Sequence, residues 1–195
     1  MAILNVTYAG RSADAPHHVD DRTVDGDIRR IAVELLRTGG LTGLVRVNLL
    51  GAMLLTRAVL PRMLERRHGA IISVGSLSGR VAMEPLYSAT KYGLRGFSLA
   101  LRRQLAGTGV SVSLVSPGNI NTEMTRHITA PLPEPSLVAT AIADLVRRPR
   151  REVVVPGRHY AIAWLEQALP TLTDLMHRRR GWSPVREEET ATWTS

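Results

Sequence analysis

The sequence predicts an α/β chain with a parallel sheet and flanking helices. Three short runs of apolar and β-branched residues predict buried strands, at 70–74, 110–115 and 152–155. Longer stretches with apolar residues at three- and four-residue steps separate them and predict helices. Strands that alternate with helices in this way are typical of parallel sheets.

The first 46 residues predict one strand and one helix. Ala2 to Thr7 is a strand pattern that Tyr8, Ala9 and Gly10 break. Further on, a group of aspartates precedes apolar residues at helical spacing, which predicts a helix ended by Thr38, Gly39 and Gly40 (aspartates 20, 21, 25 and 27; apolar residues 28, 31, 32, 35 and 36). His17 and His18 have no partner ligands at a defined spacing, so we expect a solvated pair and no metal site.

Leu44 to Arg66 carries a long apolar helix pattern that contains Asn48 and, near its end, Pro61. We expect Pro61 to bend this helix. For Asn48 the position alone supports two interpretations equally, a helix-start residue and a functional one.

The stretch from 69 to 96 carries the candidate chemistry. Ser76 follows the predicted strand Ala70–Val74, and Pro85 precedes Tyr87 and Lys91 as it would in a first helical turn. In a helix, residues four apart share a face. A nearby ammonium favours the phenolate, so we expect Lys91 to lower the pKa of Tyr87 and make it a proton donor or acceptor for a carbonyl/alcohol pair.

Lys91 is the only lysine among the 25 basic residues of the chain. Lysine is a compact charge whose pKa can shift, whereas arginine stays charged, so this single lysine favours a chemical role. The alternative is a surface lysine beside a tyrosine that packs in the core, because two residues four apart form a loose pattern.

Several ordered motifs together resemble the short-chain dehydrogenase/reductase family. Val47-Asn48-Leu49-Leu50-Gly51 resembles V-N-x-x-G, Leu60-Pro61-Arg62-Met63 resembles L-P-x-M, Ser76 with Gly79 fits S-x-x-G, Tyr87 with Lys91 fits Y-x-x-x-K, and residues 117–122 resemble P-G-x-I/V-x-T. The resemblance is good over residues 44–156 and implies a Rossmann-like parallel sheet. It implies hydride exchange between NAD or NADP and a small carbonyl or alcohol substrate.

The resemblance also implies a role for each matching residue. Tyr87 would transfer the proton, Lys91 would lower its pKa and contact the cofactor ribose, Ser76 would orient the substrate oxygen, and Asn48 would hold a helix distortion and support the proton path. The cofactor-binding set would be Ala9, Gly10, Tyr87, Lys91, Pro117, Gly118, Ile120 and Thr122. Ser76 and Tyr87 are closer in sequence than is usual in the family, and Ser73 and Ser78 are alternatives to Ser76.

The family's first strand and its T-G-x-x-x-G-x-G turn have no counterpart here. That turn lets backbone N–H groups approach the pyrophosphate. We therefore expect an N-terminally truncated member whose first strand has an unpaired apolar edge, with an insertion between Gly10 and Asn48.

After the third strand we expect a loop over Glu123–Pro135, which in the family closes over the substrate, and a helix over Leu137–Val146. Arg147, Arg148, Arg150 and Arg151 are interpreted as a solvated turn in preference to a phosphate or membrane contact. Ala161 to Arg180 is amphipathic, basic at its end and interrupted by Pro170; packing is favoured over peripheral membrane contact. Residues 1–181 would form the domain and 182–195 a disordered tail.

The amino-acid composition argues against several classes of function. Net charge is +8, aromatic residues make up only 4%, and there is no cysteine. Stacking platforms for nucleic-acid bases are scarce, and disulfides, thiolate catalysis and cysteine-bound zinc are absent. No secretory signal or uninterrupted 18-residue apolar run is visible in this sequence, which favours a cytoplasmic protein.

Two other functions stay open. A catalytically inactive remnant would serve as a dimerisation or binding module, because the helix after Tyr87 forms the dimer face in the family. An arginine-rich nucleic-acid binder would bind DNA in a strongly salt-dependent way, but the arginines are scattered along the chain. A homo-oligomeric oxidoreductase without nucleic acid is the favoured prediction.

Overall fold

A four-stranded parallel sheet with the strand order β1-β2-β3-β4 organises the part of the chain that the computed structural model describes, residues 2–4 and 40–179. The elements in chain order are β1 (Ala2–Leu4), α2 (Gly40–Val45), η1 (Arg46–Leu50), α3 (Gly51–Glu65), β2 (Gly69–Val74), η2 (Leu77–Gly79), α4 (Pro85–Gln104), β3 (Val110–Pro117), η3 (Glu123–Thr125), α5 (Pro135–Arg147), β4 (Glu152–Val155), α6 (His159–Ala168) and α7 (Pro170–Arg179).

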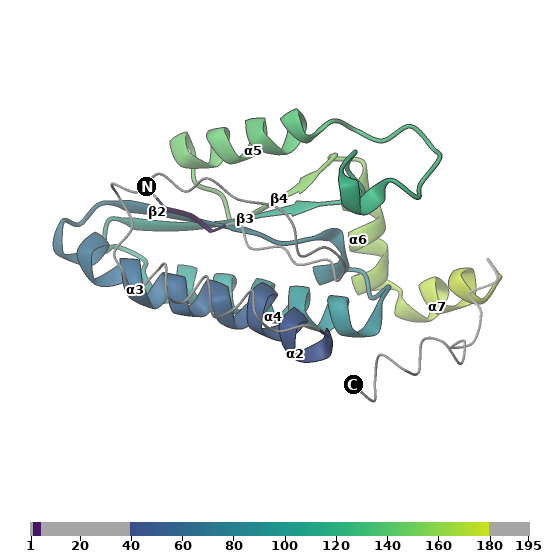
Figure 1. Cartoon of the computed structure of the whole chain (residues 1–195), viewed down its shortest axis with the longest axis horizontal. Helices are drawn as coiled ribbons and strands as arrows, with labels where there is room; N and C mark the ends of the chain where they lie inside the picture. The colour runs from purple at the N-terminus through teal and green to yellow at the C-terminus, as the bar shows by residue number, and fades with distance from the viewer. Residues whose placement is uncertain (1, 5–39, 180–195) are drawn as a thin grey trace.

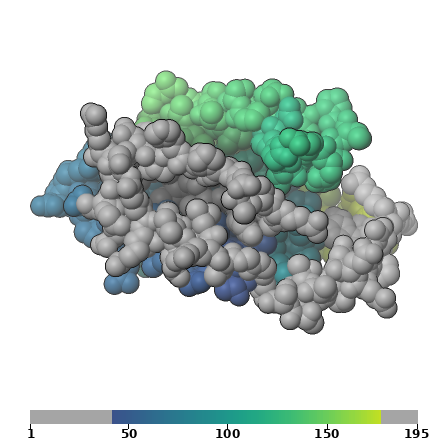
Figure 2. All heavy atoms as spheres, viewed as in Figure 1, coloured from purple at the N-terminus to yellow at the C-terminus, as the bar shows by residue number. Residues whose placement is uncertain are grey.

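Helices cover both faces of the sheet (Figure 1), with α3 and α4 on one face and α5 on the other. Neighbouring residues of β2 point to opposite faces: Ile71 packs with Met63 of α3 and Leu101 of α4, whereas Ile72 packs with Leu145 of α5. This alternation explains why the apolar run of β2 is nearly continuous, because a parallel strand is buried on both sides. In the space-filling view η3 and α5 form one border of the molecule (Figure 2).

The predicted strands at 70–74, 110–115 and 152–155 are confirmed as β2, β3 and β4, and the predicted helices over 44–66, after Tyr87 and over 137–146 are also present. Prolines mark helix starts, at Pro85 of α4, Pro135 of α5 and Pro170 of α7. Only Ala2–Leu4 of the first predicted strand is described, where it pairs with β2. The predicted helix before Thr38, the pair His17–His18 and the tail 182–195 lie outside the described residues, and Gly40, expected to end that helix, is the first residue of α2.

Residues Thr42–Glu65 form one long helical segment that is apolar enough to cross a membrane by length and composition, with a mean hydropathy of 1.5. The same segment packs into the protein core: Met63 is buried against Ile71, and Val59 and Leu60 pack beside it. One face of this segment therefore belongs to the core, and 33% of its apolar window is buried. Pro61 lies within α3, which continues to Glu65.

The two helices after β4, α6 and α7, pack on the protein core only in part. Pro170 separates α6 from α7, as predicted, and Ala163 is fully buried against Leu77 and Val154. Trp164 is nevertheless 61% exposed, and Leu172 and Leu175 are also exposed. Among the described residues of this stretch, Ala163 of α6 packs in the core and Thr173 of α7 is also buried, whereas most of the large apolar side chains are exposed.

The turn between α4 and β3 depends on Gly109. Its φ is +87°, and an added Cβ would lie 1.9 Å from the carbonyl oxygen of Arg67. We expect Gly109→Ala to lower the free energy of unfolding by more than about 3 kcal/mol, because strain and a backbone clash add. Gly107→Ala is the matched control: its φ is +80° but nothing lies within 4 Å, so about 1 kcal/mol is expected. Equal losses of unfolding free energy in the two variants, measured by urea unfolding, would contradict a backbone clash at position 109.

Candidate active site

Ser76 stands in a short loop at the carboxyl end of β2, and this loop is held against α4. The Ser76 side chain caps η2 by accepting a hydrogen bond from the Ser78 N–H at 3.1 Å. Because that bond uses an acceptor position, the Ser76 O–H can point elsewhere. Gly79 ends η2 so close to Lys91 that an added Cβ would lie 2.8 Å from the Lys91 carbonyl oxygen. The loop and the helix are therefore in backbone contact.

Tyr87 and Lys91 lie one turn apart in α4 on the same face, as predicted. The Lys91 Nζ lies 5.4 Å from the centroid of the Tyr87 ring and donates a 3.4 Å hydrogen bond to the Val74 carbonyl, the last residue of β2. The Lys91 side chain is fully buried. Burial lowers the pKa of Lys91 to about 8, since desolvation disfavours the charged amine.

The expected lowering of the Tyr87 pKa is wrong. Burial raises the pKa of Tyr87, a hydrogen bond with Ser76 lowers it in part, and the charge of Glu84 raises it again, so the pKa ends above its ordinary value. The physical reason is the burial of the phenol, which disfavours the phenolate and outweighs the hydrogen bond with Ser76. The Ser76 hydroxyl is thus close enough to Tyr87 to affect its pKa, in spite of their shortened spacing.

Asn48 lies in a distorted part of its helix, as the resemblance implies. Residues Arg46–Leu50 form the π-helical turn η1 between α2 and α3, and Asn48 is completely buried there. Its Nδ2 donates to Thr90 Oγ1 at 3.2 Å, and Thr90 Oγ1 donates to the Tyr87 carbonyl at 2.8 Å. Asn48 is thus connected to the Tyr87 backbone through Thr90, and the helix-start interpretation is wrong.

The predicted nicotinamide-end residues follow β3. Pro117 is the last residue of β3 and pairs with Val155 of β4, and the Gly118 N–H donates to the Val155 carbonyl at 2.8 Å. Ile120 is buried, whereas Thr122 is exposed and forms a capping box with Thr125 at the start of η3. Parallel strands place Pro117 and Ser76 at the same edge of the sheet, where open α/β sheets bind ligands.

The remaining candidates are placed as follows. Ala9 and Gly10 lie outside the described residues. Ser73 is buried inside β2 and accepts a hydrogen bond from the Ser98 hydroxyl at 2.9 Å. Ser78 donates its backbone N–H to the Ser76 hydroxyl. Of the three candidate serines, Ser76 is the one whose hydroxyl affects the pKa of Tyr87. The arginines at 147, 148, 150 and 151 are exposed, in agreement with a solvated turn.

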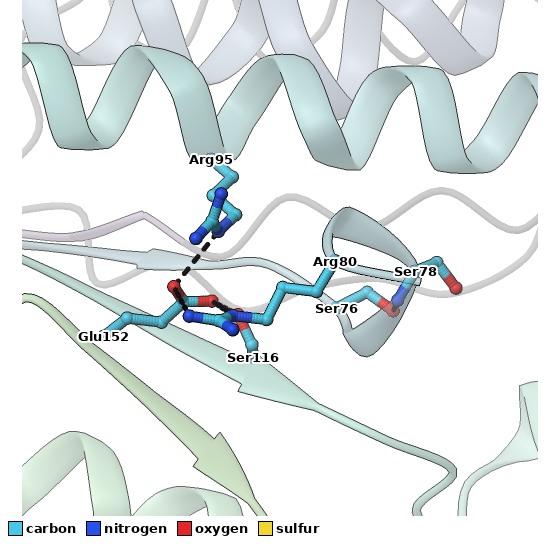
Figure 3. A network of polar contacts seen from close by, with 6 residues as sticks. All are labelled: Ser76, Ser78, Arg80, Arg95, Ser116 and Glu152. Atoms are coloured by element: carbon cyan, nitrogen blue, oxygen red, sulfur yellow. Dashed lines mark hydrogen bonds and ion pairs between the residues drawn. The ribbon is translucent and has the colours of Figure 1, made fainter. Parts of the chain in front are cut away.

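Sequence reasoning missed Thr90 and a cluster around Glu152. The Glu152 carboxylate, which the sequence pattern indicates only as the start of a strand, binds two arginines and a serine (Figure 3). Its partners Arg80, Arg95 and Ser116 are far from it in the sequence, so no local pattern could have indicated the cluster. Among the described residues there is no group of three or more metal-ligand side chains.

The parallel sheet between two helical layers, with Ser76 and Pro117 at one edge of the sheet, defines a Rossmann-like α/β fold. The family model described as short chain dehydrogenase matches residues 31–132, and the chain belongs to this family.

Two curated relatives illustrate the similarity. The ketoacyl reductase HetN of Nostoc sp. (strain PCC 7120) is 42% identical over 117 residues, which is 55% of this chain and 41% of the relative. The 3-oxoacyl-[acyl-carrier-protein] reductase FabG of Escherichia coli K12 is 40% identical over 88 residues, 44% of this chain and 36% of the relative. The matched part of the chain thus spans about two fifths of their length.

Solved structures support the same fold. A short chain dehydrogenase from Burkholderia cenocepacia J2315 in complex with NADP matches with a TM-score of 0.65 at 24% identity, over 80% of this chain and 75% of that one. A 4-hydroxyisoleucine dehydrogenase complexed with NADH matches with a TM-score of 0.53 at 25% identity, over 59% of this chain and 57% of that one.

Proposed function

We propose that this chain carries the proton-transfer site of an NAD- or NADP-dependent oxidoreductase that interconverts a carbonyl and an alcohol. The observation that carries the proposal is the group formed by Ser76, Tyr87 and the buried amine of Lys91 at the carboxyl end of β2. The reduction consumes a carbonyl, a reduced dinucleotide and a proton, and it yields an alcohol and the oxidised dinucleotide.

In this reaction Tyr87 gives its phenolic proton to the carbonyl oxygen, while the Ser76 hydroxyl donates a hydrogen bond to the same oxygen. The phenol of Tyr87 carries its proton at neutral pH and can therefore donate it, while its raised pKa makes it a weaker acid than a free phenol. Asn48 and Thr90 hold the backbone of Tyr87 in place.

The amine of Lys91 fits the ribose of a nicotinamide dinucleotide. It has three N–H donors, and the hydrogen bond described for it is a long one of 3.4 Å to Val74. Pro117, Gly118, Ile120 and Thr122 would border the nicotinamide end, with Ala9 and Gly10 as further proposed contacts. The nicotinamide supplies the hydride when it is bound.

The relatives favour a 3-oxoacyl compound as the first substrate to test, since FabG and HetN carry the names of 3-oxoacyl and ketoacyl reductases. The solved relatives hold NADH or NADP, so both forms of the cofactor are candidates. Homo-oligomeric assembly and a cytoplasmic location stay predictions.

Titration of the purified protein with NADH and with NADPH, followed by nicotinamide fluorescence, tests the proposal. We expect saturable binding of at least one of them, and loss of the reduced cofactor's absorbance when a 3-oxoacyl thioester is added. Binding of neither cofactor would contradict the proposal and favour the inactive remnant.

A further inference from the structure

Glu152, the first residue of β4, is the centre of a buried cluster of charges (Figure 3). Its Oε1 accepts hydrogen bonds from Arg80 Nε and Ser116 Oγ, both at 2.8 Å. Its Oε2 accepts from Arg80 Nη2 at 2.9 Å and from Arg95 Nε at 3.1 Å. The Glu152 side chain is only 3% exposed. One carboxylate therefore accepts four hydrogen bonds in a largely dry environment.

The three partners come from the three segments that carry the proposed site. Arg80 directly follows η2, the short helix that Ser76 caps. Arg95 lies in α4 one turn after Lys91, and Ser116 directly precedes Pro117 at the end of β3. Ser76, Lys91 and Pro117 are thus each one to four residues from a group that Glu152 holds, and Tyr87 lies one further helical turn before Lys91.

The geometry of the contacts makes them suited to fixing distances. The contact with Arg80 is bidentate, and a planar guanidinium paired with a carboxylate in this way fixes orientation as well as separation. Two guanidiniums share the single carboxylate, so its removal would leave the buried Arg80 and the partly buried Arg95 without this anion, which is costly. Burial raises the pKa of Glu152, but Arg80, Ser116 and Arg95 outweigh it and lower the pKa overall, so the carboxylate is ionised at neutral pH.

We propose that Glu152 is a positioning residue of the proposed active site, which sets the Ser76 loop, the Tyr87–Lys91 turn and the end of β3 relative to one another through Arg80, Arg95 and Ser116. The proposal rests on the proposed function for its catalytic consequence. Glu152 has no described contact with Tyr87 or Lys91 and acts through its partners.

The single lysine of the chain provides a test that does not depend on activity. Protein labelled with ¹³C-lysine gives one side-chain signal, that of Lys91, whose titration we expect near pH 8. Burial is the cause of this low pKa. If Glu152→Gln loosens the contact between η2 and α4, water reaches the amine and the Lys91 pKa rises by about 1 or more. Loss of a distant negative charge alone would leave that pKa unchanged or lower it, so the direction of the shift separates positioning from electrostatics.

Activity gives the second readout. We expect Glu152→Gln to lower kcat by about 10-fold or more, with a smaller change in KM, because misplacement of catalytic groups acts on the reacting geometry. Asp144→Asn is the matched control: it removes an exposed carboxylate paired with Arg147, and both readouts should stay as in the wild type. Ser116→Ala removes one of the four hydrogen bonds to Glu152 and should raise the Lys91 pKa by a smaller amount. If Glu152→Gln does not fold, the Lys91 pKa of Ser116→Ala tests whether the Glu152 cluster positions the site.

A folded Glu152→Gln variant with the Lys91 pKa and kcat of the wild type would overturn the proposal. If the wild type binds no cofactor, the proposed function fails, but the Lys91 titration still decides whether Glu152 positions the helix. The two failures are therefore distinguishable.

Discussion

Tyr87→Phe is expected to lower the turnover of a 3-oxoacyl thioester by about 10³-fold, since it removes the proton donor and leaves the rest of the site in place. The ring keeps its position over Lys91, 5.4 Å from Nζ, so cofactor affinity and the free energy of unfolding should change little. Steady-state rates with NADH and NADPH, together with a fluorescence titration of each cofactor, measure both effects.

Tyr92→Phe provides the matched control for this variant. Tyr92 lies in the same helix, five residues after Tyr87, and it is 40% exposed. The same hydroxyl is deleted there, and we expect turnover to stay within about twofold of the wild type. Equal losses in the two variants, or full activity in Tyr87→Phe, would contradict the role of Tyr87.

Lys91→Met is expected to separate stability from function: the protein becomes more stable near neutral pH but loses turnover. Burial lowers the pKa of Lys91 from 10.5 to about 8, which corresponds to about 3 kcal/mol against the folded state while the amine is charged. Methionine has a similar shape and no charge to desolvate, and replacing a buried charge by an apolar group is often stabilising.

The direction in which the free energy of unfolding changes with pH shows whether the charged Lys91 amine destabilises the folded protein. Between pH 8 and 10.5 the unfolded chain binds the lysine proton and the folded chain does not, so this group makes the free energy of unfolding of the wild type rise with pH in that window. Lys91→Met should lack this rise, as urea unfolding at several pH values would measure. Arg103→Met, an exposed basic residue of the same helix, should leave the rise unchanged. A loss of stability in Lys91→Met at every pH would show that the amine is paired.

Local patterns predicted most of the fold for a physical reason. Strands buried on both faces must be nearly continuous apolar runs, and prolines at 85, 135 and 170 mark helix starts because proline fits a first turn. The π-helical turn at Asn48 does not follow from apolar periodicity, and only the family resemblance indicated a distortion there.

The sequence predicted which residues form the candidate site, but it did not predict how their pKa values are shifted. Tyr87 and Lys91 share a face because of their spacing, yet the pKa of Tyr87 depends on its burial and on the hydrogen bond with Ser76, and neither follows from spacing. Glu152 shows the same limit, because Arg80 is 72 residues from it in the chain and Ser116 is 36 residues from it. Contacts of this kind are made by the sheet topology, which sets Leu114 of β3 beside Glu152.

Transfer of a deuterium label tests the central claim, that Ser76, Tyr87 and Lys91 form an oxidoreductase site, most directly. The protein is incubated with a 3-oxoacyl thioester and with NADH or NADPH that carries deuterium at the transferable position of the nicotinamide, and the product is analysed by mass spectrometry. We predict one deuterium on the former carbonyl carbon with the wild type and, in the same time, essentially none with Tyr87→Phe. Saturable cofactor binding without any label in the product, or equal labelling by the two proteins, would contradict the claim.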